Sequence, residues 1–163
     1  MPRAPFTPDP AWRRCHANQA GFTLIELMIA VVVLAILTTI AYPTYNEFIM
    51  RSRITEATSG MNDFRTRMEQ YFQDNRTYAN AGACGLADPA FVPGESSFQI
   101  LCSAASATGY QLDANGNAAK GMSLFRYRML VSPAGVVRSS TITQPGWSAS
   151  ANCWTVRKNG KCS

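Results

Sequence analysis

The chain has 163 residues, of which 15 are Lys or Arg and 10 are Asp or Glu, so its formal net charge at pH 7 is +5. This mildly basic balance identifies no class of partner by itself. His16 is the only histidine, which excludes a Ser-His-Asp or Cys-His catalytic arrangement from residues 17–163.

Residues 1–21 form a basic segment that contains four prolines. It carries Arg3, Arg13 and Arg14 against one acidic residue, Asp9, and it lacks the apolar stretch of a secretory signal peptide. Because basic residues that precede a span stay in the cytoplasm, the C-terminal part of the chain is expected to face outward.

The run from Phe22 to Tyr42 is apolar and contains a single charge, Glu26. At about 1.5 Å per residue this run is long enough to cross a bilayer, and it predicts one membrane-spanning helix. A carboxylate at the bilayer centre costs roughly 2–3 kcal/mol, and less toward an end. Glu26 therefore needs a partner, and the run offers none at helical spacing.

The sequence Gly21-Phe22-Thr23-Leu24-Ile25-Glu26-Leu27, with its apolar continuation, resembles the N-terminal methylation motif of type IV prepilins and of the related type II secretion pseudopilins. The resemblance implies that a prepilin peptidase cuts between Gly21 and Phe22 and methylates the new N-terminus at Phe22. It also implies that Glu26 pairs with the N-terminal ammonium of a neighbouring subunit in the filament core. This agrees with the physics, because a paired charge can be buried where a lone one cannot. An ordinary signal anchor with a chance glutamate is the alternative.

Pro43 ends the apolar run and is expected to kink or break the helix, because proline removes a backbone hydrogen bond. Beyond it, apolar residues recur at steps of four and three, which is typical of the buried stripe of an amphipathic helix ending near residues 74–77. A stripe confined to this second half indicates that a globular domain packs there. The stripe consists of Met50, Ile54, Ala57, Met61, Phe64, Met68 and Tyr71.

Residues 79–95 are rich in Gly, Ala and Pro and predict a loop. Strand-like runs follow at 97–102, 110–113, 124–131 and 136–142, and in the third run Arg126 and Arg128 alternate with apolar residues. We therefore expect an α+β fold in which a long N-terminal helix packs on a small antiparallel sheet, the lollipop layout of a pilin. The expected regions are a cleaved leader at 1–21, a transmembrane and filament-core helix at 22–49, and a periplasmic head at 50–163.

Four cysteines follow the leader, and an even number outside the cytoplasm indicates disulfides. Of the three connectivities that four cysteines permit, we favour Cys84–Cys102 and Cys153–Cys162. A zinc site is a poor alternative, because the spacing is wrong and no histidine remains. No metal or cofactor is predicted. A faint calcium-loop pattern at Asp113, Asn115 and Asn117 has Leu124 at its twelfth position, so a turn between strands explains it better.

Six basic residues of the predicted strands and the terminal loop form a candidate DNA-binding surface, with Trp147 and Trp154 near in sequence for base stacking. The commoner alternative is a solvated sheet face with scattered charge. The six residues are Arg126, Arg128, Arg138, Arg157, Lys158 and Lys161.

The segment from Tyr42 to Tyr78 is most similar to the PilE-like and ComP-like minor pilins, a branch that includes pilus-assembly and DNA-uptake pilins. The resemblance implies a structural subunit and not an enzyme: a minor pilin of a type IV pilus that takes part in assembly or initiation and serves twitching motility, adhesion or DNA uptake. The implied partners are other pilin subunits, the prepilin peptidase and the inner-membrane assembly platform. The subunit is expected in the inner membrane, with its N-terminus cytoplasmic and its head periplasmic, and then in the extracellular pilus.

Three alternatives remain: the major pilin of the fibre, a DNA-binding competence pilin and a type II secretion pseudopilin. The last is disfavoured by the cysteines, because the main pseudopilins usually lack disulfides and carry a calcium loop.

Overall fold

The computed structural model describes residues 21–162, and the chain divides into two compact units between Ala41 and Tyr42. The predicted leader therefore lies outside the described residues, apart from Gly21. The elements in chain order are the helix α1 (Leu24–Asn75), β1 (Ala79–Asn80), β2 (Ala83–Cys84), β3 (Phe98–Ser103), β4 (Tyr110–Gly116), a 3₁₀ turn η1 (Ala118–Lys120), β5 (Phe125–Ser132), β6 (Gly135–Ile142) and a 3₁₀ turn η2 (Lys158–Gly160).

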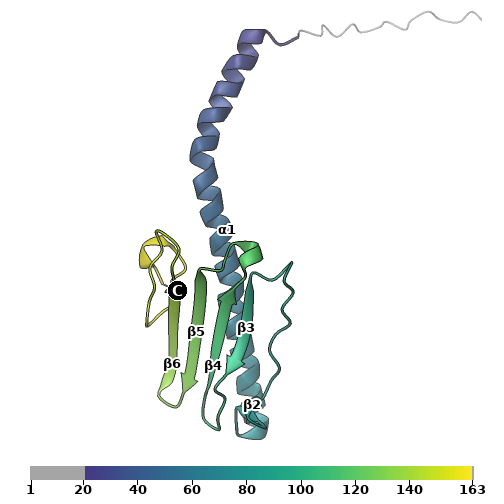
Figure 1. Cartoon of the computed structure of the whole chain (residues 1–163), viewed down its shortest axis with the longest axis vertical. Helices are drawn as coiled ribbons and strands as arrows, with labels where there is room; N and C mark the ends of the chain where they lie inside the picture. Colours follow the sequence, from purple (N-terminus) through teal and green to yellow (C-terminus); the bar gives the residue numbers. More distant parts are fainter. Residues whose placement is uncertain (1–20, 163) are drawn as a thin grey trace, which may run out of the picture. The chain divides into compact units, whose positions relative to one another are not determined.

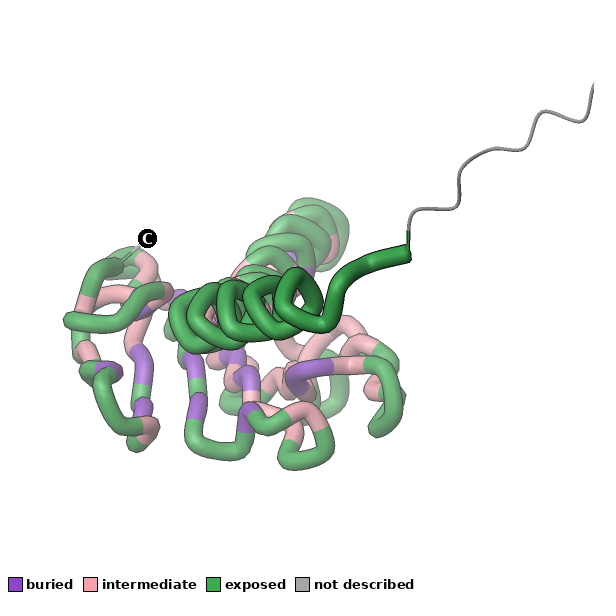
Figure 2. Tube along the Cα trace, turned by 90° about the horizontal axis from the view of Figure 1, so that it is seen from above, coloured by how far each residue is buried: buried purple, intermediate pink, exposed green. Residues whose placement is uncertain are grey.

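In the N-terminal unit, the first half of α1 is apolar and exposed around its whole circumference (Figure 2). A window of this helix has a mean hydropathy of 2.7 and is 0% buried, so it is long and apolar enough to cross a membrane. The hydroxyl of Thr38 donates to the carbonyl of Leu34 at 2.9 Å, and that of Thr39 donates to the carbonyl of Ile36 at 2.7 Å. These polar groups are thus satisfied within the helix, as an apolar surrounding requires.

α1 continues through Pro43 and ends at Asn75, within the region where the sequence predicts its end. Its second half lies against one face of the four-stranded sheet in the second unit (Figure 1). The apolar stripe has the predicted period: Ile54, Ala57, Met61, Phe64 and Met68 are buried, and Met50 packs against the core as a partly buried residue.

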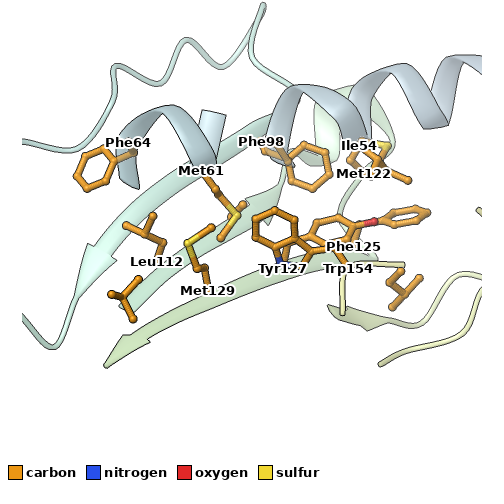
Figure 3. Packing of buried hydrophobic residues seen from close by; sticks show 14 of the residues in the cluster. Ile54, Met61, Phe64, Phe98, Leu112, Met122, Phe125, Tyr127, Met129 and Trp154 are labelled. Carbon is orange, nitrogen blue, oxygen red and sulfur yellow. The ribbon is translucent and has the colours of Figure 1, made fainter. Parts of the chain in front are cut away.

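The sheet is an antiparallel meander in the order β3-β4-β5-β6. Along β5, buried and exposed residues alternate, so that Phe125, Tyr127 and Met129 face α1 while Arg126 and Arg128 face solvent, as the period-two pattern predicts. Figure 3 shows side chains of α1 and of the strands pointing toward one another in this core. Trp154, from the C-terminal segment, is also buried there.

The prediction of a structureless loop at 79–95 is wrong in one detail, because β1 and β2 form a short antiparallel hairpin there. Ala81, with a φ of 49°, and Gly82, with a φ of 85°, make the turn between them. Strands of two residues have too few ladder contacts to produce a periodic pattern in the sequence.

Two disulfides hold segments that the sheet does not pair. Cys84–Cys102 joins β2 to β3, with 6.1 Å between the Cα atoms, and Cys153–Cys162 closes the C-terminal loop, with a Cα separation of 5.7 Å. Both are the pairings that the sequence favoured among the three connectivities. A head of this size has a thin core, and such cross-links stabilise it by restricting the unfolded chain.

Candidate functional site

The N-terminal end of α1 presents the motif residues to solvent. Phe22 is 81% exposed, and the helix begins two residues later at Leu24. The hydroxyl oxygen of Thr23 accepts a hydrogen bond from the backbone N–H of Glu26 at 3.2 Å. Thr23 therefore caps the helix, and Glu26 occupies the third helical position, as in a capping box.

This cap is a feature that the sequence prediction missed, although the Thr-x-x-Glu spacing signals it. A carboxylate in the first turn is favoured by the partial positive charge of a helix N-terminus. No ion pair engages Glu26 within residues 21–162. Its carboxylate is exposed in the first turn of the helix and is available to a cation from another chain.

The surroundings of Gly21 are open. A Cβ added at Gly21 would meet nothing within 4 Å, so the fold does not itself require glycine at this position. A requirement for glycine here would have to come from an enzyme that binds this segment.

The six candidate DNA-binding residues do not converge in the structure. Arg126 and Arg128 lie on the outer face of the sheet, where Arg128 Nε is 2.8 Å from Asp113 Oδ1. They border an open depression of about 270 Å³. Its lining residues are Leu101, Ser103, Asp113, Asn115, Arg126 and Arg128.

Arg138 faces the opposite side of the sheet, because its register partner on β5 is the buried Met129. Its guanidinium lies 5.2 Å from the centre of the Trp154 ring. This cation–π contact covers the edge of the core, which is a packing role.

The remaining three basic residues, Arg157, Lys158 and Lys161, are exposed in the C-terminal loop. Lys158 Nζ lies 4.0 Å from Glu47 Oε2, near the start of the head's part of α1. Positive charge is thus distributed over three places, and no single stripe joins the six residues.

The expectation that Trp147 and Trp154 could stack on bases is wrong. Trp154 is 2% exposed and its indole N–H donates to the carbonyl of Arg128 at 2.9 Å, and Trp147 is 7% exposed, with its ring edge-on to Phe125. Both rings belong to the core, which is where most large aromatic side chains gain stability.

The calcium-loop pattern is divided by the fold. Asp113 and Asn115 lie within β4 and not in a turn, and Asn117 caps η1 by accepting the backbone N–H of Ala119 at 3.0 Å. Among residues 21–162 there is no group of three or more His, Cys, Asp or Glu side chains that could hold a metal ion.

Buried phenols mark the most strongly perturbed titratable groups. Burial raises the pKa of Tyr110 and of Tyr127 above the usual tyrosine value. Burial, and then the hydrogen bond that its hydroxyl donates to Glu69 at 2.8 Å, raises the pKa of Tyr78 to about 12. The hydroxyl of Tyr127 donates to the carbonyl of Thr155 at 2.9 Å, so these groups connect the C-terminal segment and the hairpin region to the core.

Comparison with known proteins agrees with this architecture. The family model described as the prokaryotic N-terminal methylation motif matches residues 16–42, and the model of the type IV minor pilin ComP, DNA uptake sequence receptor, matches residues 43–123. No solved structure matches significantly.

Curated relatives are fimbrial proteins. The fimbrial protein EcpC of Eikenella corrodens is 36% identical over 92 residues, which cover 56% of this chain and 59% of the relative. The type IV major fimbrial protein FimA of Dichelobacter nodosus is 45% identical over 56 residues, which cover 34% of this chain and 35% of the relative. The chain thus matches just over half the length of one relative and about a third of the other. With its methylation motif, its single long apolar helix and its disulfide-linked α+β head, the chain is similar to the type IV pilin family, and the two family models together match residues 16–123.

Proposed function

We propose that this protein is a minor pilin that takes part in assembly or initiation of a type IV pilus. The observation that carries the proposal is the first half of α1, an apolar helix that is exposed on every side and begins with a capped turn containing one carboxylate, Glu26. Such a helix is stable only in lipid or among other apolar helices. The match of residues 43–123 to a minor-pilin family supports the minor role.

In this proposal a prepilin peptidase cuts between Gly21 and Phe22 and methylates Phe22. Before assembly, the subunit resides in the inner membrane with its head in the periplasm. The assembly platform extracts it, and contacts with other helices replace contacts with lipid. The role is structural, without catalysis.

Glu26 has the central part in extraction. A carboxylate in an apolar surrounding is costly alone and is stabilised when a cation lies beside it. The ammonium group at Phe22 of a neighbouring subunit supplies that cation, so pairing favours the filament over the membrane.

Replacement of Glu26 tests this role. Glu26→Gln should leave cleavage and membrane insertion intact but reduce incorporation into sheared filaments by tenfold or more, if the pair contributes at least about 1.4 kcal/mol. Glu26→Asp keeps the charge and is the matched control. Normal incorporation of the Gln variant would refute the pairing.

Quantitative mass spectrometry of sheared filaments separates the candidate roles. Trace abundance with a methylated Phe22 at the N-terminus is expected for a minor pilin, whereas dominant abundance would make this protein the fibre subunit. Processed protein that stays in the membrane and is absent from filaments would favour a pseudopilin.

DNA binding is the second candidate, favoured by the description of the matched family as a DNA uptake sequence receptor. The six candidate basic residues all lie outside the matched stretch, at 126–161. Among the six, within residues 21–162, only Arg126 and Arg128 lie side by side on the outer face of the sheet, both on β5.

Binding of labelled duplex DNA to the processed chain in detergent tests this candidate. Affinity that falls steeply with salt and is lost in Arg126→Ala with Arg128→Ala would support it, because phosphate contacts release counterions. Arg138→Ala, on the opposite face, is the control. Undetectable or salt-independent binding would contradict DNA recognition.

A further inference from the structure

A groove separates the first turns of the head's part of α1 from the C-terminal loop. Its volume is about 500 Å³. Every residue that lines it belongs to the unit Tyr42–Ser163. These residues are Phe48, Arg51, Ser52, Thr55, Val156 and Arg157.

Positive charge dominates this groove. Arg51 and Arg157 line it, and Lys158 lies beside them, against one carboxylate, Glu47, which forms ion pairs with Arg51 and Lys158. No hydrogen bond or ion pair engages the guanidinium of Arg157 within residues 21–162. The Arg51 side chain is 40% exposed, and among the described residues only one terminal nitrogen of its donors is paired, with Glu47. Two guanidinium groups with unused donors are suited to the oxygens of a phosphate.

Exposed aromatic residues connect the groove to the end of the apolar run. Tyr42, Tyr45 and Phe48 are 70%, 63% and 67% exposed, although they are large and apolar. Aromatic side chains of this kind are enriched at the interface between membrane and water. Phe48 is both the last of the three and part of the groove wall.

The spacing along the helix fits the headgroup layer. Arg51 follows Tyr42 by nine residues of one continuous helix, which is about 13 Å of axial rise. Side chains of a helix tilt toward its N-terminus, and long basic side chains reach toward the interface. The guanidinium of Arg51 can therefore reach the headgroup region, which extends roughly 5–8 Å beyond the hydrocarbon.

We propose that this groove binds the phosphate headgroup of an anionic phospholipid in the outer leaflet of the inner membrane before assembly. Arg51 and Arg157 donate to the phosphate oxygens, and Phe48 and Val156 contact the apolar part of the lipid. The inference rests on the proposed membrane residence of the subunit. Duplex DNA also offers phosphates, but it has no acyl chain to cover Phe48 and Val156. Extraction into a filament would then have to break headgroup contacts as well as release the helix from lipid.

The test uses the processed chain, which begins at Phe22, in nanodiscs of phosphatidylcholine alone or mixed with phosphatidylglycerol. Hydrogen exchange is followed in the segments 42–55 and 154–161. Phosphatidylglycerol should slow exchange of the C-terminal loop at low ionic strength, and high salt should reverse the effect. Each basic residue near an anionic surface contributes roughly fivefold to attachment, so the protection should fall by about that factor in Lys158→Gln.

Arg51→Gln with Arg157→Gln should abolish the protection, whereas Arg126→Gln with Arg128→Gln, on the outer sheet face, should retain it. Thermal unfolding in phosphatidylcholine nanodiscs checks that each variant is folded. Lys158→Gln keeps both guanidinium groups. If the double variant does not fold, the expected fall in protection in Lys158→Gln tests the proposal instead.

The outcomes separate the two levels of the proposal. A chain that inserts into both membranes without any dependence on phosphatidylglycerol overturns the headgroup site and leaves membrane residence standing. A chain that inserts into neither overturns membrane residence and the headgroup site with it. Protection by added duplex DNA in phosphatidylcholine nanodiscs, without protection by phosphatidylglycerol, would assign the groove to nucleic acid instead.

Discussion

The two halves of α1 differ in how far their apolar side chains are buried. The first half is the more apolar of the two, yet its side chains are exposed: Ile29, Leu34 and Leu37 are each more than half accessible. The second half mixes Arg, Glu and Asp with apolar residues, yet Ile54, Met61 and Phe64 are each 0% exposed. What differs is the distribution of apolar residues around the helix, on all sides in the first half and in one stripe in the second.

Hydrophobicity alone therefore does not determine what a helix contacts. A stripe fits one partner surface, and the sheet of the same chain supplies it. A helix that is apolar on every side needs an apolar surrounding, which a single small head cannot provide. The stability of the head should therefore depend on the second half and be insensitive to the first.

The largest effect on stability is expected when one apolar side chain in each half is replaced by alanine and the two variants are compared. Phe64→Ala should lower the free energy of unfolding of the head by about 3–5 kcal/mol, because it leaves a cavity between α1 and the sheet. Leu34→Ala, at a 60% exposed position, should leave it unchanged. Thermal unfolding of the processed chain in detergent measures both changes. Equal losses of stability in the two variants would contradict the statement that the head depends on the second half of α1 alone.

Loss of a disulfide should act on the second half alone. Cys84→Ser with Cys102→Ser opens a link across 18 residues, and Cys153→Ser with Cys162→Ser opens one across 9. Each should destabilise the head by about 2–4 kcal/mol, somewhat more for the longer loop. Denaturant unfolding gives the difference, and membrane insertion of the first half should persist in both double variants.

The buried phenols give a smaller effect that depends on pH. Because the folded state raises these pKa values, the unfolded chain loses its phenolic protons first, from about pH 10. Stability of the head should therefore be complete below that pH and should fall as the pH rises toward the pKa of Tyr78, about 12. Denaturant unfolding of the head across this range should show the decline, and a stability independent of pH from neutral to strongly alkaline solution would be inconsistent with these shifts.

Two variants that replace tyrosine by phenylalanine measure how much each buried hydroxyl contributes to the stability of the head at neutral pH. Tyr127→Phe should cost about 1–3 kcal/mol, because the carbonyl of Thr155 loses its donor. Tyr110→Phe removes a buried hydroxyl that has no partner in residues 21–162, so it should be close to neutral. Denaturant midpoints at pH 7 compare the two, and a larger loss for Tyr110→Phe would mean that its hydroxyl is bonded in solution.

The smallest expected effect is at Gly60, on the sheet side of the second half. Gly60→Ala gains about 1 kcal/mol of helix propensity, but the new Cβ would lie 2.7 Å from the flexible end of Ile100. The two terms oppose each other, and the net change should be within about 0.5 kcal/mol. A loss of several kcal/mol in the unfolding free energy would show that Ile100 cannot move.

Local patterns in the sequence are sufficient to predict the long helix, its buried stripe and the alternation along β5. The end of α1 near Asn75, the stripe from Ile54 to Met68 and the alternation along β5 all follow from periods of 3.6 and 2, which neighbouring residues alone create. The motif around Phe22 and Glu26 is likewise contiguous, although the capping role of Thr23 was overlooked. The β1–β2 hairpin was missed because its strands are too short to carry a period.

Which charges share a surface depends on the pairing of strands and on the path of the C-terminal segment, and local sequence patterns do not contain that information. Arg126 and Arg138 are both basic strand residues in the sequence, but the register that pairs Met129 with Arg138 places them on opposite faces of the sheet. Arg157 reaches the groove beside Arg51 because the C-terminal segment returns to α1, a contact between residues far apart in the chain. The same return buries Trp154 in the core. Periodicity determines which side of an element is apolar, whereas the pairing of distant elements determines what that side meets.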